Sequence, residues 1–184
     1  MRRNMILTGI LALFILSAST IAYASTSAFD KQMHSILVEY LKIPKILAAD
    51  KTTGVTDAAK AIGKLAAGLD SSTVTGMHAK HYKKVPADIK AAAKKLTTAA
   101  DIATMREALK DLSKPMAMWA GMSKPKGVSV MYCSMAPGSW LQKNDTVISN
   151  PYYGAKMLRC GDIVGGEGSA KSAPKQDGHS GHGH

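Results

Sequence analysis

Two cysteines and two nearby methionines form the part of this sequence best suited to chemistry. Cys133 and Cys160 are the only cysteines of the 184-residue chain. Met135 lies two residues after Cys133, and Met157 lies three residues before Cys160. Thiolate and thioether sulfur select soft ions such as copper(I) over harder ions. The spacing therefore indicates a soft-metal site made of Cys133, Met135, Met157 and Cys160.

A disulfide is the competing interpretation of the same cysteines. A bridge between Cys133 and Cys160 needs only oxidation and proximity, and an oxidising compartment supplies the first. In the chain-entropy model, closing this loop stabilises the fold by about 3.5 kcal/mol. The two interpretations also fit as two states of one site, either oxidised and bridged or reduced and metallated.

A second group of metal-binding residues lies at the C-terminus. His179, His182 and His184 are separated by glycine and serine, a composition typical of flexible metal-binding tracts. Imidazoles in such a tract suit copper(II), nickel or zinc. We therefore expect a weak divalent-metal site there, separate from the cysteines.

A methionine cluster near the middle of the chain admits two interpretations. Met116, Met118 and Met122 flank Trp119, and thioethers beside an indole ring could hold copper(I). Methionine also fills irregular gaps in hydrophobic cores. The cluster is therefore either a ligand set or part of the core at the end of a helix.

The residues around the cysteines carry a resemblance. The ordered blocks are Tyr132-Cys133-x-Met135, Trp140-Leu141-Gln142, Asn150-Pro151-Tyr152-Tyr153-Gly154 and Met157-Leu158-x-Cys160-Gly161. This set resembles the closing signature of a domain-of-unknown-function family of exported bacterial proteins. Members occur alone or appended to periplasmic adaptor subunits of copper/silver efflux systems. The resemblance implies a copper-handling role, with an efflux adaptor or another periplasmic protein as partner.

The resemblance extends upstream more weakly and has one departure. The segments 36–50 and 103–120 fit the family's two better-marked helical segments. The family usually has proline where this chain has Ser134. This change loosens the turn between Cys133 and Met135 but removes neither sulfur.

The N-terminus has the pattern of a cleavable signal peptide. Arg2 and Arg3 precede an apolar run over 5–16, and Ala22-Tyr23-Ala24 matches a signal peptidase site. The run is shorter than the roughly 20 residues that span a membrane. We therefore expect removal of residues 1–24, a periplasmic or secreted protein, and no stable membrane insertion.

Composition argues against nucleic-acid binding and against catalysis. Without its signal peptide the chain keeps 22 basic residues, almost all lysine, against 13 acidic residues. Nucleic-acid binding would favour clustered arginine with exposed aromatic residues. The sequence has no nucleophile motif, phosphate-binding loop or telling pair of carboxylates, and its cysteines are too far apart for a Cys-x-x-Cys redox motif. We therefore expect a binding protein and not an enzyme.

Apolar side chains recur at helical spacing in four segments, which predicts an antiparallel four-helix bundle over about residues 27–122. The segments are 28–43, 57–69, 86–96 and 101–112. Pro44 should break or kink the first helix, and Pro115 should disturb the last. Thr56 or Asp57 can cap the second helix, Pro86 suits the first position of the third, and Asp101 can cap the fourth.

The character of the sequence changes after the helices. Residues 128–133 are β-branched and alternating, which predicts a strand, and a second short strand around 157–164 is expected to pair with it. Residues 165–184 lack large apolar side chains and are expected to be disordered. The predicted organisation is thus one mainly α domain over 25–164, with a small Cys/Met β/loop module at its C-terminal end and a His-tipped tail.

Overall fold

The computed structural model describes residues 28–75 and 79–166, which are mainly helical with one small antiparallel sheet. The α-helices are α1 (Ala28–Tyr40), α2 (Lys42–Ala48), α3 (Val55–Ala67), α4 (Ala79–Tyr82), α5 (Val85–Thr98) and α6 (Ile102–Ser123). The strands are β1 (Val128–Cys133), β2 (Gly138–Lys143) and β3 (Asp162–Gly166), and the 3-10 helices are η1 (Ser71–Thr73) and η2 (Gly154–Met157). The predicted mainly α class with a small β module is confirmed.

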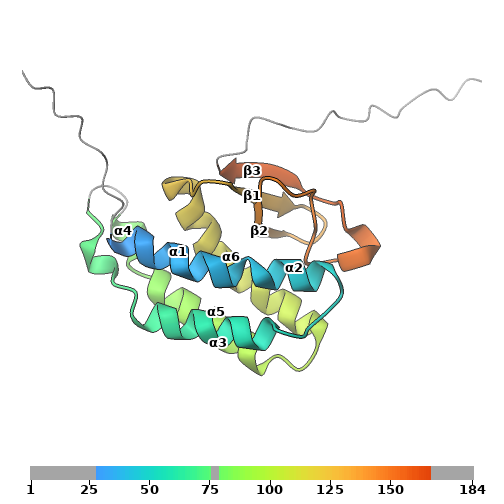
Figure 1. The fold of residues 1–184 in the computed structure, drawn as a ribbon, viewed down its shortest axis with the longest axis horizontal. Helices are drawn as coiled ribbons and strands as arrows, with labels where there is room; N and C mark the ends of the chain where they lie inside the picture. The colour runs from blue at the N-terminus through green and yellow to red at the C-terminus, as the bar shows by residue number, and fades with distance from the viewer. Residues whose placement is uncertain (1–27, 76–78, 167–184) are drawn as a thin grey trace, which may run out of the picture.

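The helices support the sheet through α6. Helix α3 packs against α1 and α5, α5 packs against α6, and α6 contacts β2. Figure 1 shows α1 and α2 crossing the middle of the molecule, with α3 and α5 on one side and the sheet on the other. The strand order is β2-β1-β3, with both pairs antiparallel. Strand β1 is therefore the central strand, and it ends at Cys133.

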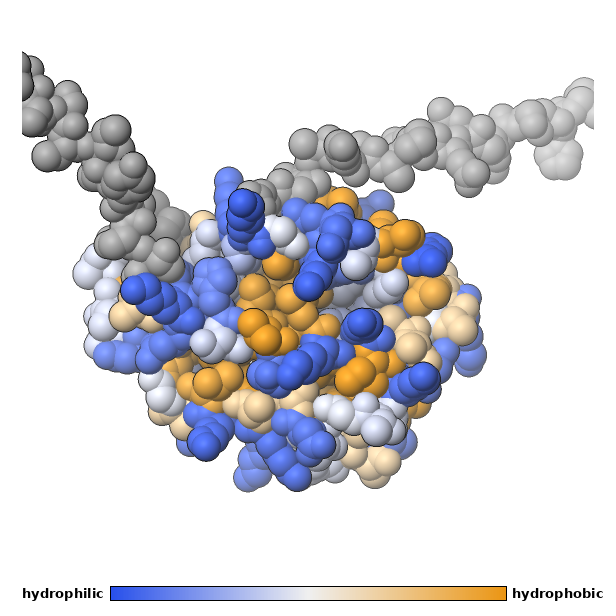
Figure 2. All heavy atoms as spheres, in the orientation of Figure 1, coloured by the Kyte–Doolittle hydropathy of each residue, from blue (hydrophilic) through white to orange (hydrophobic). Residues whose placement is uncertain are grey.

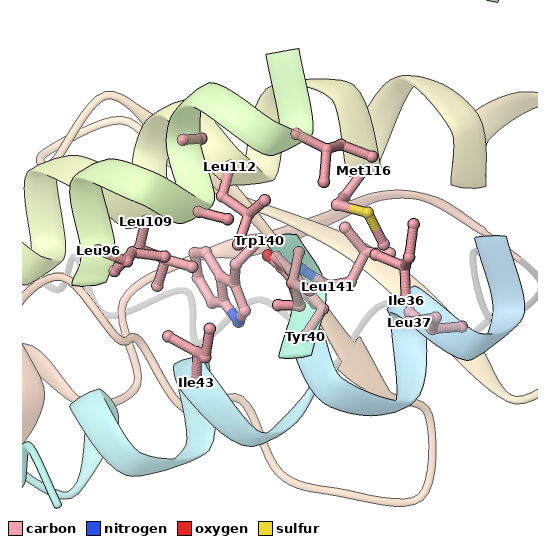
Figure 3. Close-up of a cluster of buried hydrophobic side chains, with 14 of the residues drawn as sticks. Ile36, Leu37, Tyr40, Ile43, Leu96, Leu109, Leu112, Met116, Trp140 and Leu141 are labelled. Carbon is pink, nitrogen blue, oxygen red and sulfur yellow. The ribbon is translucent and has the colours of Figure 1, made fainter. Parts of the chain in front are cut away.

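Strand β2 belongs to the same hydrophobic core as the helices (Figure 3). Trp140 and Leu141 are fully buried and lie among Tyr40, Ile43 and Leu109. The Tyr40 hydroxyl shares a hydrogen bond of 2.6 Å with Ser113 and accepts one from the Leu141 amide at 3.2 Å. These contacts join α1, α6 and β2, so the sheet is an integral part of the helical domain.

The first helix breaks three residues earlier than its proline suggests. Helix α1 ends at Tyr40 and α2 begins at Lys42, so Pro44 lies in the first turn of α2. Proline is tolerated there because the first amides of a helix have no intrahelical acceptor.

Three predicted helix starts can be compared with the structure. Asp101 caps α6 as expected, with its side chain accepting from the Thr104 amide at 2.7 Å. Pro86 is the second residue of α5 and not the first. The prediction for α3 was wrong: the cap is Gly54, at a φ of 95°, and not Thr56 or Asp57. A left-handed backbone angle there favours glycine over any side-chain cap.

Pro115 does not end the last helix. Helix α6 continues to Ser123, and Pro115 is buried within it. Proline in a helix interior costs about 3 kcal/mol. Burial of Met116 and Trp119 beyond the proline offsets that cost, because each fully buried side chain of this size contributes about 1.5–3 kcal/mol.

The sheet has one strand that sequence reasoning missed and one that is shorter than expected. Strand β2 was not predicted. Residues 157–161 belong to η2 and a turn, so only the end of the expected segment 157–164 pairs with β1, as β3. Strand β3 also includes Gly165 and Gly166, two residues assigned to the tail. The rest of the tail lies outside the described residues.

The surface seen in Figure 2 carries hydrophilic side chains around smaller apolar patches. Within residues 28–75 and 79–166, no helix has both the length and the apolar character needed to cross a membrane.

Candidate thiol site

The structure brings the two cysteines together, as both interpretations of the sequence require. Cys133 ends β1, and Cys160 lies in the turn between η2 and β3. Their Sγ atoms are 3.0 Å apart, although the residues are 27 positions apart in the chain. Both are free cysteines; Cys133 is buried and Cys160 is half-buried. An incoming ion or oxidant would therefore reach the site from the side of Cys160.

The turn after β1 surrounds the Cys133 sulfur with donors. The Cys160 thiol hydrogen-bonds to the Cys133 sulfur, and the Met135 and Ala136 amides and the Asn150 side chain lie close enough to lower the pKa of that sulfur. Cys133 pairs across the sheet with Gly138. A side chain at this glycine would collide with Tyr152, since its Cβ would lie 2.8 Å from that ring.

Asn150 connects the segments that carry the two cysteines. It is fully buried, and its amide nitrogen donates to the Cys160 carbonyl at 2.8 Å. Its side-chain oxygen accepts from the Tyr152 amide at 2.8 Å and from the Tyr153 amide at 3.3 Å. Its backbone amide donates to Leu158 at 2.8 Å. One residue therefore sets the path of the segment 150–160.

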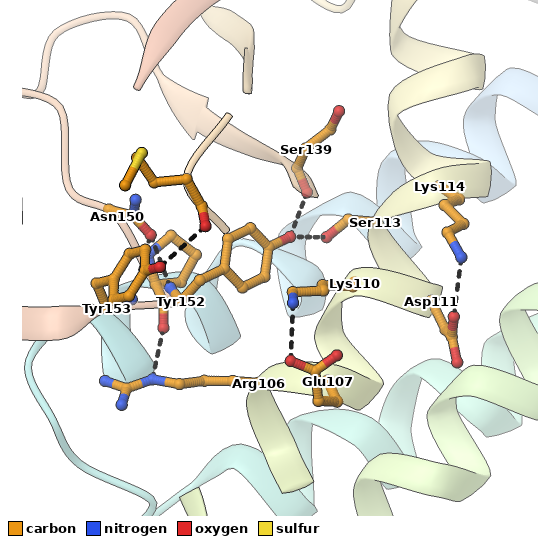
Figure 4. A network of polar contacts seen from close by, with 12 residues as sticks. Arg106, Glu107, Lys110, Asp111, Ser113, Lys114, Ser139, Asn150, Tyr152 and Tyr153 are labelled. Carbon is orange, nitrogen blue, oxygen red and sulfur yellow. Dashed lines mark hydrogen bonds and ion pairs between the residues drawn. The ribbon is translucent and has the colours of Figure 1, made fainter. Parts of the chain in front are cut away.

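Two tyrosines fix this segment against the rest of the domain (Figure 4). The Tyr153 hydroxyl donates to the Met135 carbonyl at 2.9 Å, which ties the segment to the turn after β1. The Tyr152 hydroxyl donates to the Ser139 carbonyl and lies 3.4 Å from the Ser113 hydroxyl. The segment 150–160 is thus held to the turn after β1, to β2 and to α6.

Arg106 and Asp50 anchor the other side of the segment. The Arg106 guanidinium donates to the carbonyls of Pro151 and Leu47, at 2.8 and 3.0 Å, and to the Asp50 carboxylate at 2.6 Å. The second oxygen of Asp50 accepts from the Ala155 amide at 2.8 Å, at the start of η2. The C-terminal end of α2, α6 and the segment 150–160 therefore meet at one ion pair.

The two thiols differ in acidity. Burial acts to raise the pKa of Cys133, but the hydrogen bonds from Cys160, from the Ala136 and Met135 amides and from Asn150 outweigh it and lower that pKa below its ordinary value. The hydrogen bond to Cys133, with burial adding, raises the pKa of Cys160 to about 11. The first proton to leave the pair is therefore that of Cys133, and the remaining thiol of Cys160 hydrogen-bonds to the thiolate.

The two methionines of the predicted site lie in the same two turns. Met135 is in the turn after β1, and its side chain is 61% exposed. Met157 ends η2, is half-buried, and its carbonyl accepts from the Cys160 amide at 3.0 Å. Each methionine thus lies within three residues of a cysteine, and Met135 lies at the surface.

The other candidate metal residues have different outcomes. Met116 and Trp119 are fully buried, and Met118 and Met122 pack against the core. The indole nitrogen of Trp119 donates to the Asp30 carboxylate at 2.8 Å. This favours the core interpretation of that cluster. His179, His182 and His184 lie outside the described residues. Within the described ranges, no group of three or more His, Cys, Asp or Glu side chains is placed to hold a metal ion.

The comparisons with known proteins give one match. Residues 36–126 match the family model described as "Protein of unknown function (DUF3347)". That stretch contains a domain of unknown function. No curated protein and no solved structure matches the chain. The DUF3347 match runs from within α1 to just before β1, so both cysteines and the signature blocks around them lie beyond it.

Sequence reasoning missed the residues that position the thiols. Asn150 was named only as the first residue of a signature block, and Arg106 and Asp50 were not singled out. A signal for Asn150 was present, because an asparagine followed by proline often accepts from the amides two and three residues later. Arg106 and Asp50 are 56 residues apart, and no local pattern pairs them.

Proposed function

We propose that this protein is an exported heavy-metal-binding protein. Its leading metal is copper(I), which it binds through Cys133 and Cys160. The observation that carries the proposal is the 3.0 Å contact between the two sulfurs, with the Cys160 backbone held in place by the buried Asn150 side chain. Thiolates are the ligands that copper(I) prefers. The signature resemblance supplies the further proposal that the metal passes to an efflux adaptor.

Small movements of Cys160 would admit the ion. With metal–sulfur bonds of about 2.3 Å, two thiolates on one ion stand about 4 Å apart. The sulfurs are 3.0 Å apart in the free protein, so they must separate by about 1 Å. The half-buried Cys160 can make this adjustment more easily than the buried Cys133. Met135 and Met157 would complete the coordination as thioether ligands.

A disulfide-closed interaction module without metal is the second candidate. The same 3.0 Å contact favours it, because the sulfurs need to approach by only about 1 Å to reach bonding distance. An exported protein meets oxidising conditions. In that case the site staples the sheet to the segment 150–160, and a protein partner binds elsewhere on the surface.

Copper(I) titration of the reduced protein against a chromophoric chelator separates the two candidates. Wild type should bind one equivalent, and Cys133→Ser/Cys160→Ser should abolish tight binding. Met135→Leu/Met157→Leu should weaken the affinity at least tenfold, while Met118→Leu on α6 serves as the matched control and should leave it unchanged. Reduced wild type that fails to bind copper(I) would leave the disulfide module as the better account.

The proposal also covers where the protein is located and which helices support the site. We propose that residues 1–24 are removed on export and that the mature chain begins at Ser25 in the periplasm or outside the cell. The intact mass of the exported protein tests this. We also propose that α1, α3, α5 and α6 act as an antiparallel four-helix scaffold for the site. The C-terminal histidines would add weak binding of copper(II), nickel or zinc.

A further inference from the structure

A cleft of about 480 Å³ lies between α2 and β2, and neither cysteine lines it. Its apolar lining comes from α2 and the residue before it, from β2 and from the segment after η2. These residues are Leu41, Pro44, Ala48, Trp140, Leu141 and Leu158. Pockets that bind small molecules commonly have volumes of about 300–1,000 Å³ and mostly apolar linings. The cleft has the size and lining of such a site.

The apolar residues lie below the rim and do not protrude. Trp140 and Leu141 are fully buried, Pro44 is buried, and Leu41 and Leu158 are half-buried. Membrane-binding surfaces present large apolar side chains outward, and a typical protein partner covers about 800 Å² per side. A recessed apolar floor instead suits a narrow apolar chain that enters from solvent.

The charged side chains at the rim of the cleft favour a ligand with a negatively charged head group. Lys45 on α2 and Lys143 at the end of β2 both line the cleft, together with one acidic residue, Asp145. Neither lysine takes part in an ion pair within the described residues. Two ammonium groups against one carboxylate favour an anionic head group.

The remaining polar side chains of the rim are already occupied. Gln142 donates to the carbonyls of Thr146 and Val147 and accepts from the Ser149 amide. The Ser149 hydroxyl donates to the backbone carbonyl of Val147, and the Thr146 hydroxyl donates to the backbone carbonyl of Lys143. The loop 142–149 is therefore held in place by its own hydrogen bonds, which leaves the two lysines as the groups that recognise a ligand.

We propose that this cleft binds a free single-chain amphiphilic anion, such as a medium-chain carboxylate. The chain lies on Leu41, Pro44 and Leu158, and the acidic head lies at the rim with Lys45 and Lys143. This site is independent of the thiol pair, so Cys133→Ser/Cys160→Ser should bind the same ligand equally well.

Calorimetric titration of the full chain with decanoate, octanoate and decanol tests the proposal. Decanoate should bind saturably below its micelle concentration, and at least tenfold more tightly than decanol. Octanoate should bind roughly tenfold more weakly than decanoate, because each buried methylene contributes about 0.8 kcal/mol. Equal binding of decanol and decanoate, or no saturable binding of decanoate, would overturn the assignment.

Variants locate the site. Lys45→Glu/Lys143→Glu should weaken decanoate binding at least tenfold, and Ala49→Leu, which adds bulk at an exposed lining position, should do the same. Lys90→Glu on α5 is the charge-matched control and should bind like wild type. The milder Lys45→Gln/Lys143→Gln keeps the test usable if charge reversal impairs folding. An equal loss in Lys90→Glu, or recruitment to anionic vesicles without decanoate binding, would show that general surface charge is responsible.

Discussion

The thiol of Cys133 has a lowered pKa without the help of a charged side chain from the described part of the chain. The groups that lower its pKa are neutral dipoles: two backbone amides, the Asn150 side chain and the Cys160 thiol. In many reactive cysteines a lysine, an arginine or a protonated histidine has this role. The lowered pKa of Cys133 therefore rests on hydrogen bonds and not on an ion pair.

Replacement of Cys160 should make Cys133 less acidic. In Cys160→Ala, burial of Cys133 remains but one hydrogen bond to its sulfur is lost, so the pKa of Cys133 should rise. The thiolate fraction at a given pH then falls. Thiolate ultraviolet absorbance, followed against pH, measures this. The reciprocal variant Cys133→Ala should lower the pKa of Cys160 from about 11. Unchanged titration of both single variants would show that the thiols are not hydrogen-bonded.

Asn150 should be essential for the stability of the site. Asn150→Ala leaves the Cys160 carbonyl and the Tyr152 amide without their partner, and each buried unsatisfied group costs about 1–3 kcal/mol. Asn150→Asp keeps the acceptor for the tyrosine amides but places a buried carboxylate against the Cys160 carbonyl, so it should also be destabilised at neutral pH. Urea unfolding of the reduced protein compares the three. Equal unfolding midpoints for Asn150→Ala and wild type would show that the hydrogen bonds of Asn150 do not stabilise the site.

At the scale of elements, the helices were easier to predict than the strands. Helical spacing of apolar residues marks α1, α3, α5 and α6, because each buries one face. Strand β2 has no such pattern: Trp140 and Leu141 are consecutive and both are fully buried. A strand buried on both faces loses the alternation that identifies a half-buried one. The sequence therefore predicted β1, which carries Cys133, but did not predict its partner strand β2.

The ion pair between Arg106 of α6 and Asp50, in the turn after α2, should contribute more to stability than the exposed pairs. Arg106→Ala removes the donor to two backbone carbonyls and should cost about 1–3 kcal/mol of unfolding free energy. Lys114→Ala, which removes an exposed partner of Asp111, is the matched control and should cost less than about 1 kcal/mol. Similar losses in both variants, measured by urea unfolding, would mean that Arg106 is only a surface residue.

Asp50 should make stability depend on acid pH. The hydrogen bond from the Ala155 amide, with Arg106 adding, lowers the pKa of Asp50 in the folded protein. A lowered folded pKa stabilises the fold above the unfolded pKa of about 4, and this stabilisation is lost as the pH falls through the folded pKa. The destabilisation in Asp50→Asn should therefore be largest at neutral pH and shrink below about pH 4. A difference that is constant with pH would exclude the linkage.

At the scale of the whole molecule, oxidation should raise thermal stability. A bridge between Cys133 and Cys160 closes a long loop and should add about 3.5 kcal/mol, which corresponds to about 10 °C in a domain of this size. Calorimetry of oxidised and reduced samples tests this, with Cys133→Ser/Cys160→Ser as the control that should not respond to reductant. Equal melting temperatures would show that the bridge does not form or is strained.

The joining of sheet and helices sets the order in which the chain can finish folding. The contacts Tyr40–Leu141 and Asp30–Trp119 span 101 and 89 residues. When the N-terminus of the chain emerges first, α1 can pack on α3 early. The Tyr40 hydroxyl can meet the Leu141 amide only after β2 has emerged. Contacts of such separation form late. Final packing therefore waits until most of the chain, through β2, has been released.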